Sequence, residues 1–510
     1  MFAGAASYAS NLDTIGLTLL RAGTTNLDGS GVKVVQAEAP ISNSSPPPFE
    51  INPSSVGMPA AGFTYFTGPP TSVLPGSSST YPNSLGSDSG HAGAVGGFFY
   101  GLPGGVSTNV AHIDNYEANY FFLAVVPGLL AVNAPLVNQS FIATSTNAQQ
   151  QAYDSNYDNY SAQYSTLFVS GVGNGGPVNP PSTCYNGIGV GAYHGGSSVG
   201  PTLDNGRAKP DIVAPGTETS YSTPLVSGAA AILLQAGLRG DGGTDTNSAA
   251  DPRTIKTLLL NGAIKPVDWS NPSPSPLDPR YGSGVLNVFN AYKQLTAGKH
   301  DYIESSSVST GSAHPPLGTT GNVTSLSGWD FNSLSSSALS DGINHYYFNL
   351  VANPPSATFT GTITLVWNRQ AHQTDINNLD LFLYDTASGT LIAASVSVVD
   401  NVEHLYIPQL PQGRYDLQVL KHGGTTVSLS ETYALAFEFF ALRLTIAPSG
   451  NGVALTWPAY PAGFFLESAP SLSAPTTWTT FNLTPLLTNQ QNRLVVNPAT
   501  GAQFFRLSRP

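Results

Sequence analysis

Residues 207–237 read RAKPDIVAPGTETSYSTPLVSGAAAILLQAG, and this stretch of the 510-residue chain decides the fold. Residues 209–216 predict a short buried strand that Pro and Gly bring to an end. From Leu225 onward, apolar residues recur at helical spacing, and Gly228 would let such a helix pack closely on its neighbours. Ser220 therefore lies at or just before a helix N-terminus, where unpaired N–H groups favour a developing anion.

Two roles fit Ser220: a helix N-cap, for which Thr219 is equally suited, or a nucleophile. Pro224 is compatible with the helix only if it lies in the first turn. KPDIVAPG followed by S-Y-S-T-P-L-V-S-G resembles the nucleophile segment S-M-A-x-P-x-V-A-G of the subtilisin-like serine peptidases, or subtilases. The resemblance assigns the reactive hydroxyl to Ser220.

Three residues of this segment depart from the family pattern. Tyr221 and Ser222 replace the usual Met and Ala, and Glu218 replaces the Gly of the usual G-T-S. Tyr221, together with Ala92, Ala94 and Glu38 elsewhere in the chain, also suits a protein that keeps the fold without the activity.

Residues 87–97, SDSGHAGAVGG, place a His before a run of small residues. Such a run lets a helix pack flush on a sheet, and it resembles the subtilase histidine helix H-G-T-H-V-A-G. His91 matches the first His and Ala94 stands at the second. The resemblance makes His91 the general base, whereas a His taken alone is more often structural.

The largest departure from the family pattern concerns the acidic residue that completes the Ser–His–acid catalytic triad of the subtilases. Residues 31–40, GVKVVQAEAP, predict a strand and resemble the family's G-V-x-V-A-V-I-D-T-G, with Glu38 at the aspartate position. Glu keeps the charge but is one methylene longer, and glutamate serves as the acid of triads on other folds. Asp114 and Asp88 are the other candidates for this role.

Residues 164–176, YSTLFVSGVGNGG, predict a strand that runs into a Gly-rich turn. They resemble the family's A-A-G-N-x-G, in which Asn174 would be the side-chain oxyanion donor. Residues 135–141, PLVNQSF, resemble V-I-N-M-S, a strand whose backbone pairs with the substrate peptide. The resemblance therefore implies four substrate-binding residues: Asn138, Ser140, Ser170 and Gly171.

The resemblance covers residues 13–297, including the runs at 188–201 and 281–287 that close the domain. It implies an α/β fold, a doubly wound parallel subtilisin-like sheet with the site at the strand C-termini, over a domain of residues 1–300. Helices are expected at 15–21 and, after a capping Asp251, at 251–260. Residues 41–90 are rich in Pro, Ser and Gly and are expected to form long loops that either bind a ligand or are poorly ordered.

After residue 300 the pattern changes to short, evenly spaced strands. Residues 301–441 predict an antiparallel β-sandwich, similar to the jelly-roll or pre-peptidase domains that follow subtilases. Residues 442–510 resemble a small fibronectin-III-like β module. Four of its aromatic residues would suit carbohydrate but are more often core: Trp457, Trp478, Phe464 and Phe465.

Three aspartates of the sandwich are candidates for a structural calcium site, Asp375, Asp380 and Asp385. Alternation places Asp380 on a strand face and the other two in turns, which favours solvated carboxylates. The reaction itself requires no cofactor.

Composition narrows the class of function. Charged residues make up only 9% of the chain and the net charge is −12, which excludes nucleic acid as a partner. No apolar run of 18 residues predicts a membrane span. The single Cys184 is expected to be a small buried hydrophobe. The Asn-, Ser-, Thr- and Gly-rich composition suits a secreted bacterial protein, although no signal peptide is visible at the first residues.

The sequence thus predicts a secreted serine endopeptidase acting on proteins or peptides through Ser220, His91 and Glu38. The alternative is a catalytically inactive subtilase fold that works as an extracellular binding or adhesion protein, including a carbohydrate-binding one. Neither the oligomeric state nor the residue preferred before the scissile bond follows from the sequence.

Overall fold

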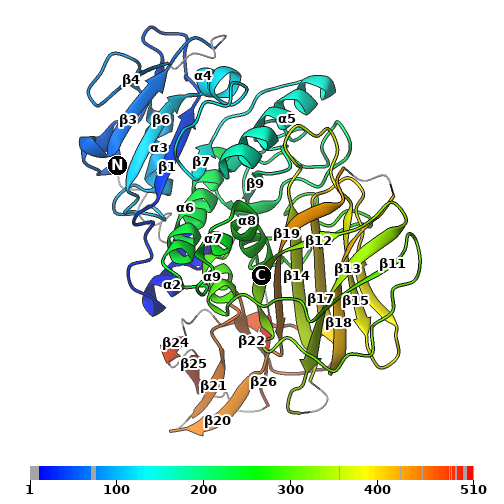
Figure 1. Cartoon of the computed structure of the whole chain (residues 1–510). Coiled ribbons are helices and arrows are strands. Elements are labelled where there is room, and N and C mark those ends of the chain that lie inside the picture. Colours follow the sequence, from blue (N-terminus) through cyan, green and yellow to red (C-terminus); the bar gives the residue numbers. More distant parts are fainter. Residues whose placement is uncertain are drawn as a thin grey trace.

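The computed structural model describes residues 11–70, 76–354, 357–424, 427–450, 452–481, 483, 485–488, 491–497 and 502–508. They form an α/β unit, a β-sandwich packed against its helices and a small β module at the C-terminal end (Figure 1). The predicted boundaries at 300/301 and 441/442 lie between elements of these units. The division into independent domains stays a prediction.

An eight-stranded sheet organises the α/β unit, in the order β10-β9-β8-β7-β1-β6-β3-β4. All neighbours are parallel except β4, which is antiparallel to β3. Strands β6 and β3 lie on one side of β1, and β7 to β10 lie on the other, so the order of strands reverses at β1. In doubly wound folds ligands bind at the carboxyl ends of the strands where the order reverses. The strands are β1 Lys33–Glu38, β3 Phe63–Thr67, β4 Ser77–Ser79, β6 His112–Glu117, β7 Leu136–Gln139, β8 Leu167–Gly171, β9 Ile188–Tyr193 and β10 Ile212–Pro215; β2 Pro48–Glu50 and β5 Ser87–Asp88 form a separate parallel pair.

Helices cover both faces of this sheet. Val34 of β1 belongs to the core beneath α3 and α6, while its neighbours Val35 and Ala37 belong to the core beneath α5, as the alternation of a strand requires. The doubly wound α/β architecture is therefore as predicted. The helices are α2 Leu17–Gly23, α3 Gly90–Phe99, α4 Ala118–Tyr120, α5 Asn147–Tyr164, α6 Thr219–Leu238, α7 Thr246–Ala249, α8 Pro252–Asn261 and α9 Val288–Thr296, with shorter turns η1 Pro53–Val56, η2 Ala60–Gly62 and η3 Phe121–Val125.

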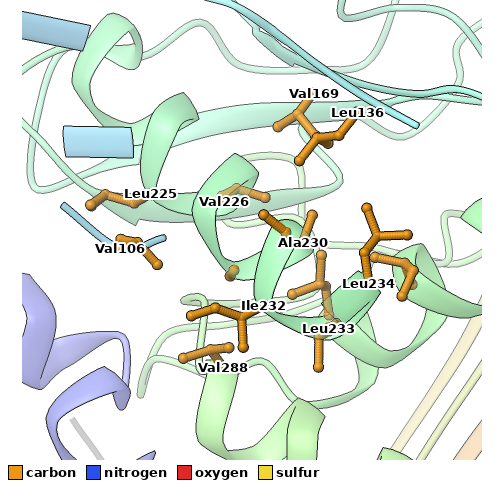
Figure 2. Packing of buried hydrophobic residues seen from close by; sticks show 14 of the residues in the cluster. Val106, Leu136, Val169, Leu225, Val226, Ala230, Ile232, Leu233, Leu234 and Val288 are labelled. Carbon is orange, nitrogen blue, oxygen red and sulfur yellow. The ribbon is translucent and has the colours of Figure 1, made fainter. Parts of the chain in front are cut away.

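Helix α6 is the central helix of the core, and Figure 2 shows its apolar side chains between the sheet and α9. A Cβ added at Gly228 would lie 2.4 Å from Cβ of Val106, so glycine permits this close approach. Among the described residues, α6 is also the one helix long and apolar enough to cross a membrane. Most of it is buried inside the protein, as expected of a core helix.

Two sequence expectations for the α/β unit need correction. The described part of residues 41–90 holds β2 to β5, and β3 joins the main sheet beside β6, so this stretch is scaffold rather than a long loop. The N-terminal helix α2 begins at Leu17, two residues later than predicted, with Gly16 at φ 75° before it. Helix α8 follows its predicted cap, Asp251, whose side chain accepts from the Arg253 N–H.

Residues after 300 form the predicted antiparallel sandwich of one five-stranded and one four-stranded sheet. Its core contains Trp367, Tyr433 and Phe437, all buried. The five-stranded sheet is β11 Glu304–Ser309, β13 Ser340–Leu350, β18 Gly413–Lys421, β15 Leu379–Asp385 and β16 Leu391–Ser395; the four-stranded sheet is β12 Ser327–Ser335, β19 Ser430–Phe440, β14 Phe359–Trp367 and β17 Val402–Leu410.

The sandwich shares a hydrophobic core with the α/β unit. Helix α8 packs across β14 and β19, and Trp329 of β12 is buried in the same apolar cluster as the helices. Its indole N–H donates to the Leu295 carbonyl at 3.1 Å. The Asn261 side chain accepts from Thr362 and Thr364 at 3.2 and 3.0 Å, so polar groups at this interface are also paired.

The C-terminal module has one four-stranded and one three-stranded sheet around a small core that includes Trp457. Trp457 is 1% exposed and therefore cannot stack on a sugar. The strands are β20 Thr445–Ser449, β21 Gly452–Pro458, β25 Gln491–Val496 and β24 Leu486–Thr488, and β23 Thr479–Thr480, β22 Phe465–Ala469 and β26 Phe504–Ser508.

Candidate active site

Ser220 is the second residue of α6, directly after the loop that follows β10. Glu218 occupies the N-cap position and makes no side-chain hydrogen bond there, so Ser220 is not the cap of this helix. The Ser220 N–H belongs to the first turn, whose N–H groups have no partner within the helix. This position leaves the backbone N–H of Ser220 available to a ligand.

Pro224 is the sixth residue of α6 and lies beyond the first turn, which corrects the sequence expectation. Proline has no N–H to donate to the Ser220 carbonyl four residues earlier. The Ser140 hydroxyl, just after β7, donates to this carbonyl at 3.0 Å instead. A side chain from the sheet thus replaces the missing helical hydrogen bond at the nucleophile.

His91 and Glu38 meet at the carboxyl end of the sheet. Glu38 is the last residue of β1 and His91 is the second of α3, which Ser89 caps by accepting from the Ala92 N–H. The His91 Nδ1 is 2.8 Å from Glu38 Oε2. The longer acid therefore reaches the imidazole.

Two buried side chains hold Glu38 from behind. Gln36 donates to Glu38 Oε1 at 2.8 Å, and the Tyr100 hydroxyl donates to the Gln36 side-chain oxygen at 2.6 Å. Glu38 is 1% exposed and Tyr100 is fully buried. This support was not predicted: Gln36 lies in the strand motif two residues before Glu38 but had no expected role, and Tyr100 lies beyond the histidine motif.

The other two candidate acids are engaged elsewhere. Asp114 lies 2.8 Å from Lys33 Nζ, and the Asp88 carboxylate accepts from the Asn52 side chain at 2.7 Å. Among the described residues, neither has a hydrogen bond or ion pair with His91.

The Glu38 carboxylate raises the pKa of His91 above its ordinary value of 6.5, chiefly through their hydrogen bond. Partial burial opposes this shift, and the charge of Glu218 adds to it. In a neutral His91 that donates from Nδ1 to Glu38, the Nε2 atom is left as the proton acceptor. This is the tautomer that a general base requires.

In the structure the Ser220 hydroxyl donates to the Ser140 carbonyl at 3.4 Å. Among the described residues no hydrogen bond joins Ser220 to His91. The two belong to neighbouring segments, since the ring centroid of Tyr221 lies 6.4 Å from that of His91. Nucleophile–base hydrogen bonds of free enzymes are often long and tighten only when substrate binds.

Asn174 follows β8 and approaches the start of α6. Its side-chain oxygen accepts from the Thr219 N–H at 2.9 Å and from the Thr219 hydroxyl at 2.8 Å. The oxygen of the amide is therefore occupied, and the amide NH₂ group is the end left to donate. Asn174 is exposed, so this group is accessible to a substrate.

The four predicted substrate-binding residues lie at the ends of β7 and β8, beside α6. Asn138 and Ser170 are buried, and their side chains bond to protein: Asn138 to Ser140 and Ser227, Ser170 to Gln139. A Cβ on Gly171 would lie 3.0 Å from the Thr223 hydroxyl. Substrate binding by this edge stays a prediction, and it would use backbone rather than these side chains.

The three aspartates named for calcium do not form a cluster. Asp380 is buried and its carboxylate accepts from His422 at 2.7 Å, which corrects its expected solvated position. Asp385 accepts from the N–H groups of Ala387 and Ser388, as a turn residue does. The described residues contain no group of three or more His, Cys, Asp or Glu placed to hold a metal ion.

A second Ser–His–Asp arrangement lies across three strands of the sandwich. The Ser306 hydroxyl is 2.8 Å from His345 Nε2, and His345 Nδ1 is 2.8 Å from the Asp416 carboxylate. His345 is 1% exposed, and Ser306 lies on an edge strand rather than at a helix N-terminus. This arrangement lacks the helical N–H donors that Ser220 has, but it calls for a control in any serine-labelling experiment.

Comparison with known proteins finds a family match within the α/β unit. Residues 124–284 match the model of the subtilase family, peptidase S8. Among solved structures, the prenylagaramide maturation protease PagA shares 19% identity over 55% of this chain and 99% of its own, with a TM-score of 0.39. The patellamide maturation protease PatA shares 21% identity over 53% and 98%, with a TM-score of 0.36.

The serine protease of Aeromonas sobria shares 12% identity over 94% of this chain and 88% of its own, with a TM-score of 0.38. At these TM-scores the family assignment rests on the sequence match rather than on structural likeness. Residues 124–284 of this chain therefore match the subtilase family of serine peptidases.

Proposed function

We propose that this protein is a secreted serine endopeptidase in which Ser220, His91 and Glu38 form the triad. The observation that carries the proposal is the 2.8 Å contact between His91 and the buried Glu38, at the sheet edge where α6 presents Ser220. Glutamate thus takes the part that aspartate has in the family pattern.

The reaction begins when the Ser220 hydroxyl turns from the Ser140 carbonyl and attacks the carbonyl carbon of a peptide bond. His91 Nε2 takes the hydroxyl proton, and Glu38 stabilises the imidazolium that forms. The C–N bond then breaks, and His91 returns the proton to the leaving amine. Water repeats the sequence on the acyl-enzyme, so no cofactor is needed.

Two donors are available for the negative oxygen of the tetrahedral intermediate: the Ser220 N–H and the Asn174 side-chain NH₂. Asn174 is held at the helix start because its oxygen accepts twice from Thr219. A donor that is fixed before the reaction stabilises the transition state without a reorganisation cost.

The substrates are proteins or peptides, as in the family, and we place the enzyme outside the cell. Support for this location comes from composition, with few charged residues and a chain rich in Ser, Asn, Thr and Gly. Fractionation of cells that express the gene with its native upstream sequence tests it.

A serine-directed fluorophosphonate probe, combined with a casein-type substrate, tests the activity. Wild type should be labelled and should cleave casein, and Ser220→Ala should lose both. Ser222→Ala is a matched control on the same helix turn, and Ser306→Ala removes the serine of the second Ser–His–Asp arrangement; both variants should keep labelling and cleavage.

The alternative function is a binding or adhesion protein with an inactive peptidase fold. The observation that favours it is the Ser220 hydroxyl, which bonds to Ser140 and not to His91. An unlabelled wild type would support this alternative and overturn the endopeptidase.

A further inference from the structure

A cavity of about 760 Å³ lies between the peptidase unit and the C-terminal module. This volume is in the range of pockets that bind small ligands, about 300–1,000 Å³. Its walls come from the N-terminal segment, the ends of β9 and β10, the start of α6 and the loop 459–465 of the module. Residues about 450 positions apart along the chain thus enclose one space.

The cavity adjoins the segment that carries the nucleophile. Tyr221, the residue after Ser220, lines it, as do Gly216 and Thr217 in the loop before α6. The ring of Tyr221 packs 5.5 Å from that of Phe98, another lining residue.

The cavity also lies away from the edge at β7 and β8 that is expected to bind the substrate peptide, and we take the part of the peptide bound there to be its acyl side. None of Asn138, Ser140, Ser170 and Gly171 is among its described lining residues. These four residues are at the ends of β7 and β8, whereas the cavity meets the ends of β9 and β10. A peptide that pairs with the first edge and crosses Ser220 therefore continues toward the cavity with its leaving-group side.

The chemistry of the walls selects for apolar groups. Leu19, Phe98, Ile264, Phe464 and Phe465 are large apolar residues among those that line it. Burying an apolar side chain against such walls removes its surface from water and therefore favours binding.

Charged groups are scarce in the same walls. Asp13 is the one carboxylate among the described lining residues, and these include no Lys or Arg. An acidic side chain would meet the like charge of Asp13 there and no Lys or Arg among the described lining residues.

The wall contributed by the module is held in place. The Ala462 N–H donates to the Asn290 side chain of α9 at 2.8 Å, and the ring of Tyr460 packs on that of Phe289 at 6.2 Å. At Gly463, with φ of 95°, a Cβ would lie 2.4 Å from Ile264 of the peptidase unit. The loop 459–465 is therefore fitted to the peptidase surface and forms a defined wall.

We propose that this cavity binds the substrate residue on the leaving-group side of the scissile bond and selects an apolar, uncharged side chain. Phe464 and Phe465 are the specificity-determining residues that the C-terminal module supplies. The inference rests on the proposed function, because it assumes that Ser220 cleaves a peptide lying across the edge of the sheet.

Two sets of substrates with one common acyl part test the proposal. The first is a peptide series with Leu, Phe, Gly or Asp directly after the scissile bond. The second is an ester or anilide with a small leaving group, which does not enter the cavity. Two variants change the cavity: Phe464→Ala removes part of its wall, and Asn492→Trp on β25 fills the space. Phe504→Ala is the control, because Phe504 is an exposed aromatic residue of the same module that does not line the cavity.

Wild type should prefer Leu and Phe over Gly and should cleave the Asp peptide least. Phe464→Ala should reduce the kcat/KM ratio of Phe to Gly peptides by about 10-fold, within the range that hydrophobic pockets discriminate. Asn492→Trp should exclude Phe while Gly peptides and the ester are turned over as before. Phe504→Ala should have the kcat/KM values of wild type with every substrate.

Unchanged Phe-to-Gly ratios in both variants, with the ester still hydrolysed, would overturn this inference and leave the endopeptidase intact. A wild type that hydrolyses neither the ester nor any peptide and takes up no fluorophosphonate would overturn the proposed function itself, and this inference with it.

Discussion

Ser140 and Ser220 are joined by two reciprocal hydrogen bonds. The Ser140 hydroxyl donates to the Ser220 carbonyl at 3.0 Å, and the Ser220 hydroxyl donates to the Ser140 carbonyl at 3.4 Å. The first bond compensates for the N–H that Pro224 lacks, and the second holds the nucleophile while no substrate is bound. Ser140, the residue that follows β7, therefore bonds to both the backbone and the side chain of Ser220.

We expect Ser140→Ala to lower both stability and turnover. The substitution leaves the Ser220 carbonyl without a donor, and an unpaired polar group of this kind costs about 1–3 kcal/mol. Ser227→Ala is the matched control, because it removes a buried hydroxyl from the same helix without touching Ser220. Denaturant unfolding and kcat measure the effect; equal kcat loss in both variants would contradict a role at the nucleophile.

Glu38→Gln should reduce kcat by about 10³–10⁴, since it removes the charge that stabilises the imidazolium and favours the wrong His91 tautomer. Glu38→Asp keeps the charge but shortens the reach by one methylene, so we expect a loss of about 10-fold or more rather than a gain. Steady-state kinetics on a peptide substrate measure both. Full activity of Glu38→Gln would show that another group orients His91.

Asn174→Ala should lower kcat by about 10²–10³ with little change in KM, because the lost hydrogen bond forms only in the transition state. Thr219→Val removes the hydroxyl that helps to hold the Asn174 side chain and keeps the backbone N–H, so its effect should be smaller. An Asn174→Ala variant in which KM rises and kcat stays constant would assign this residue to substrate binding.

The pH profile should report the raised pKa of His91. Only the neutral imidazole accepts the serine proton, so kcat/KM should fall as the pH drops through a pKa above 6.5. Glu218→Gln removes one of the charges that raise this pKa and should move the acidic limb to lower pH. Because Glu218 is exposed, the difference from wild type should shrink at high ionic strength; a difference that persists unchanged would argue against a charge effect.

Asp330→Asn should stabilise the protein at pH 7.5. Burial raises the pKa of Asp330 to about 6 from 3.8, so the folded state binds its proton more tightly and loses stability as the pH rises between these values. An uncharged amide avoids this loss at pH 7.5 and should gain little at pH 4. Thermal melts at the two pH values measure it, and an equal change at both would rule out the titration of Asp330 as the cause.

The positions of Ser220, His91 and Asn174 were predictable because each stands in a segment that resembles a subtilase motif. The acid was found by alignment from the start of its strand. Their roles are still predictions, but their placement at one sheet edge follows from parallel strands that end together.

Contacts between distant side chains were not predictable. Strands β3 and β4 were missed because they have only five and three residues and little alternation. Asp380 was expected on an open strand face, but His422, 42 residues later, covers it. The support of Glu38 by Gln36 and Tyr100 depends on packing across the sheet, which no local pattern reveals.

The core that α8 shares with β14 and β19 sets the smallest fragment that can be produced in useful form. A chain truncated after residue 300 would expose to water the side chains of α8 and α9 that now contact Trp329 and Val366. Such a fragment would collect in inclusion bodies. Expression plasmids for this enzyme should therefore extend at least to residue 441, even where only its catalysis is of interest.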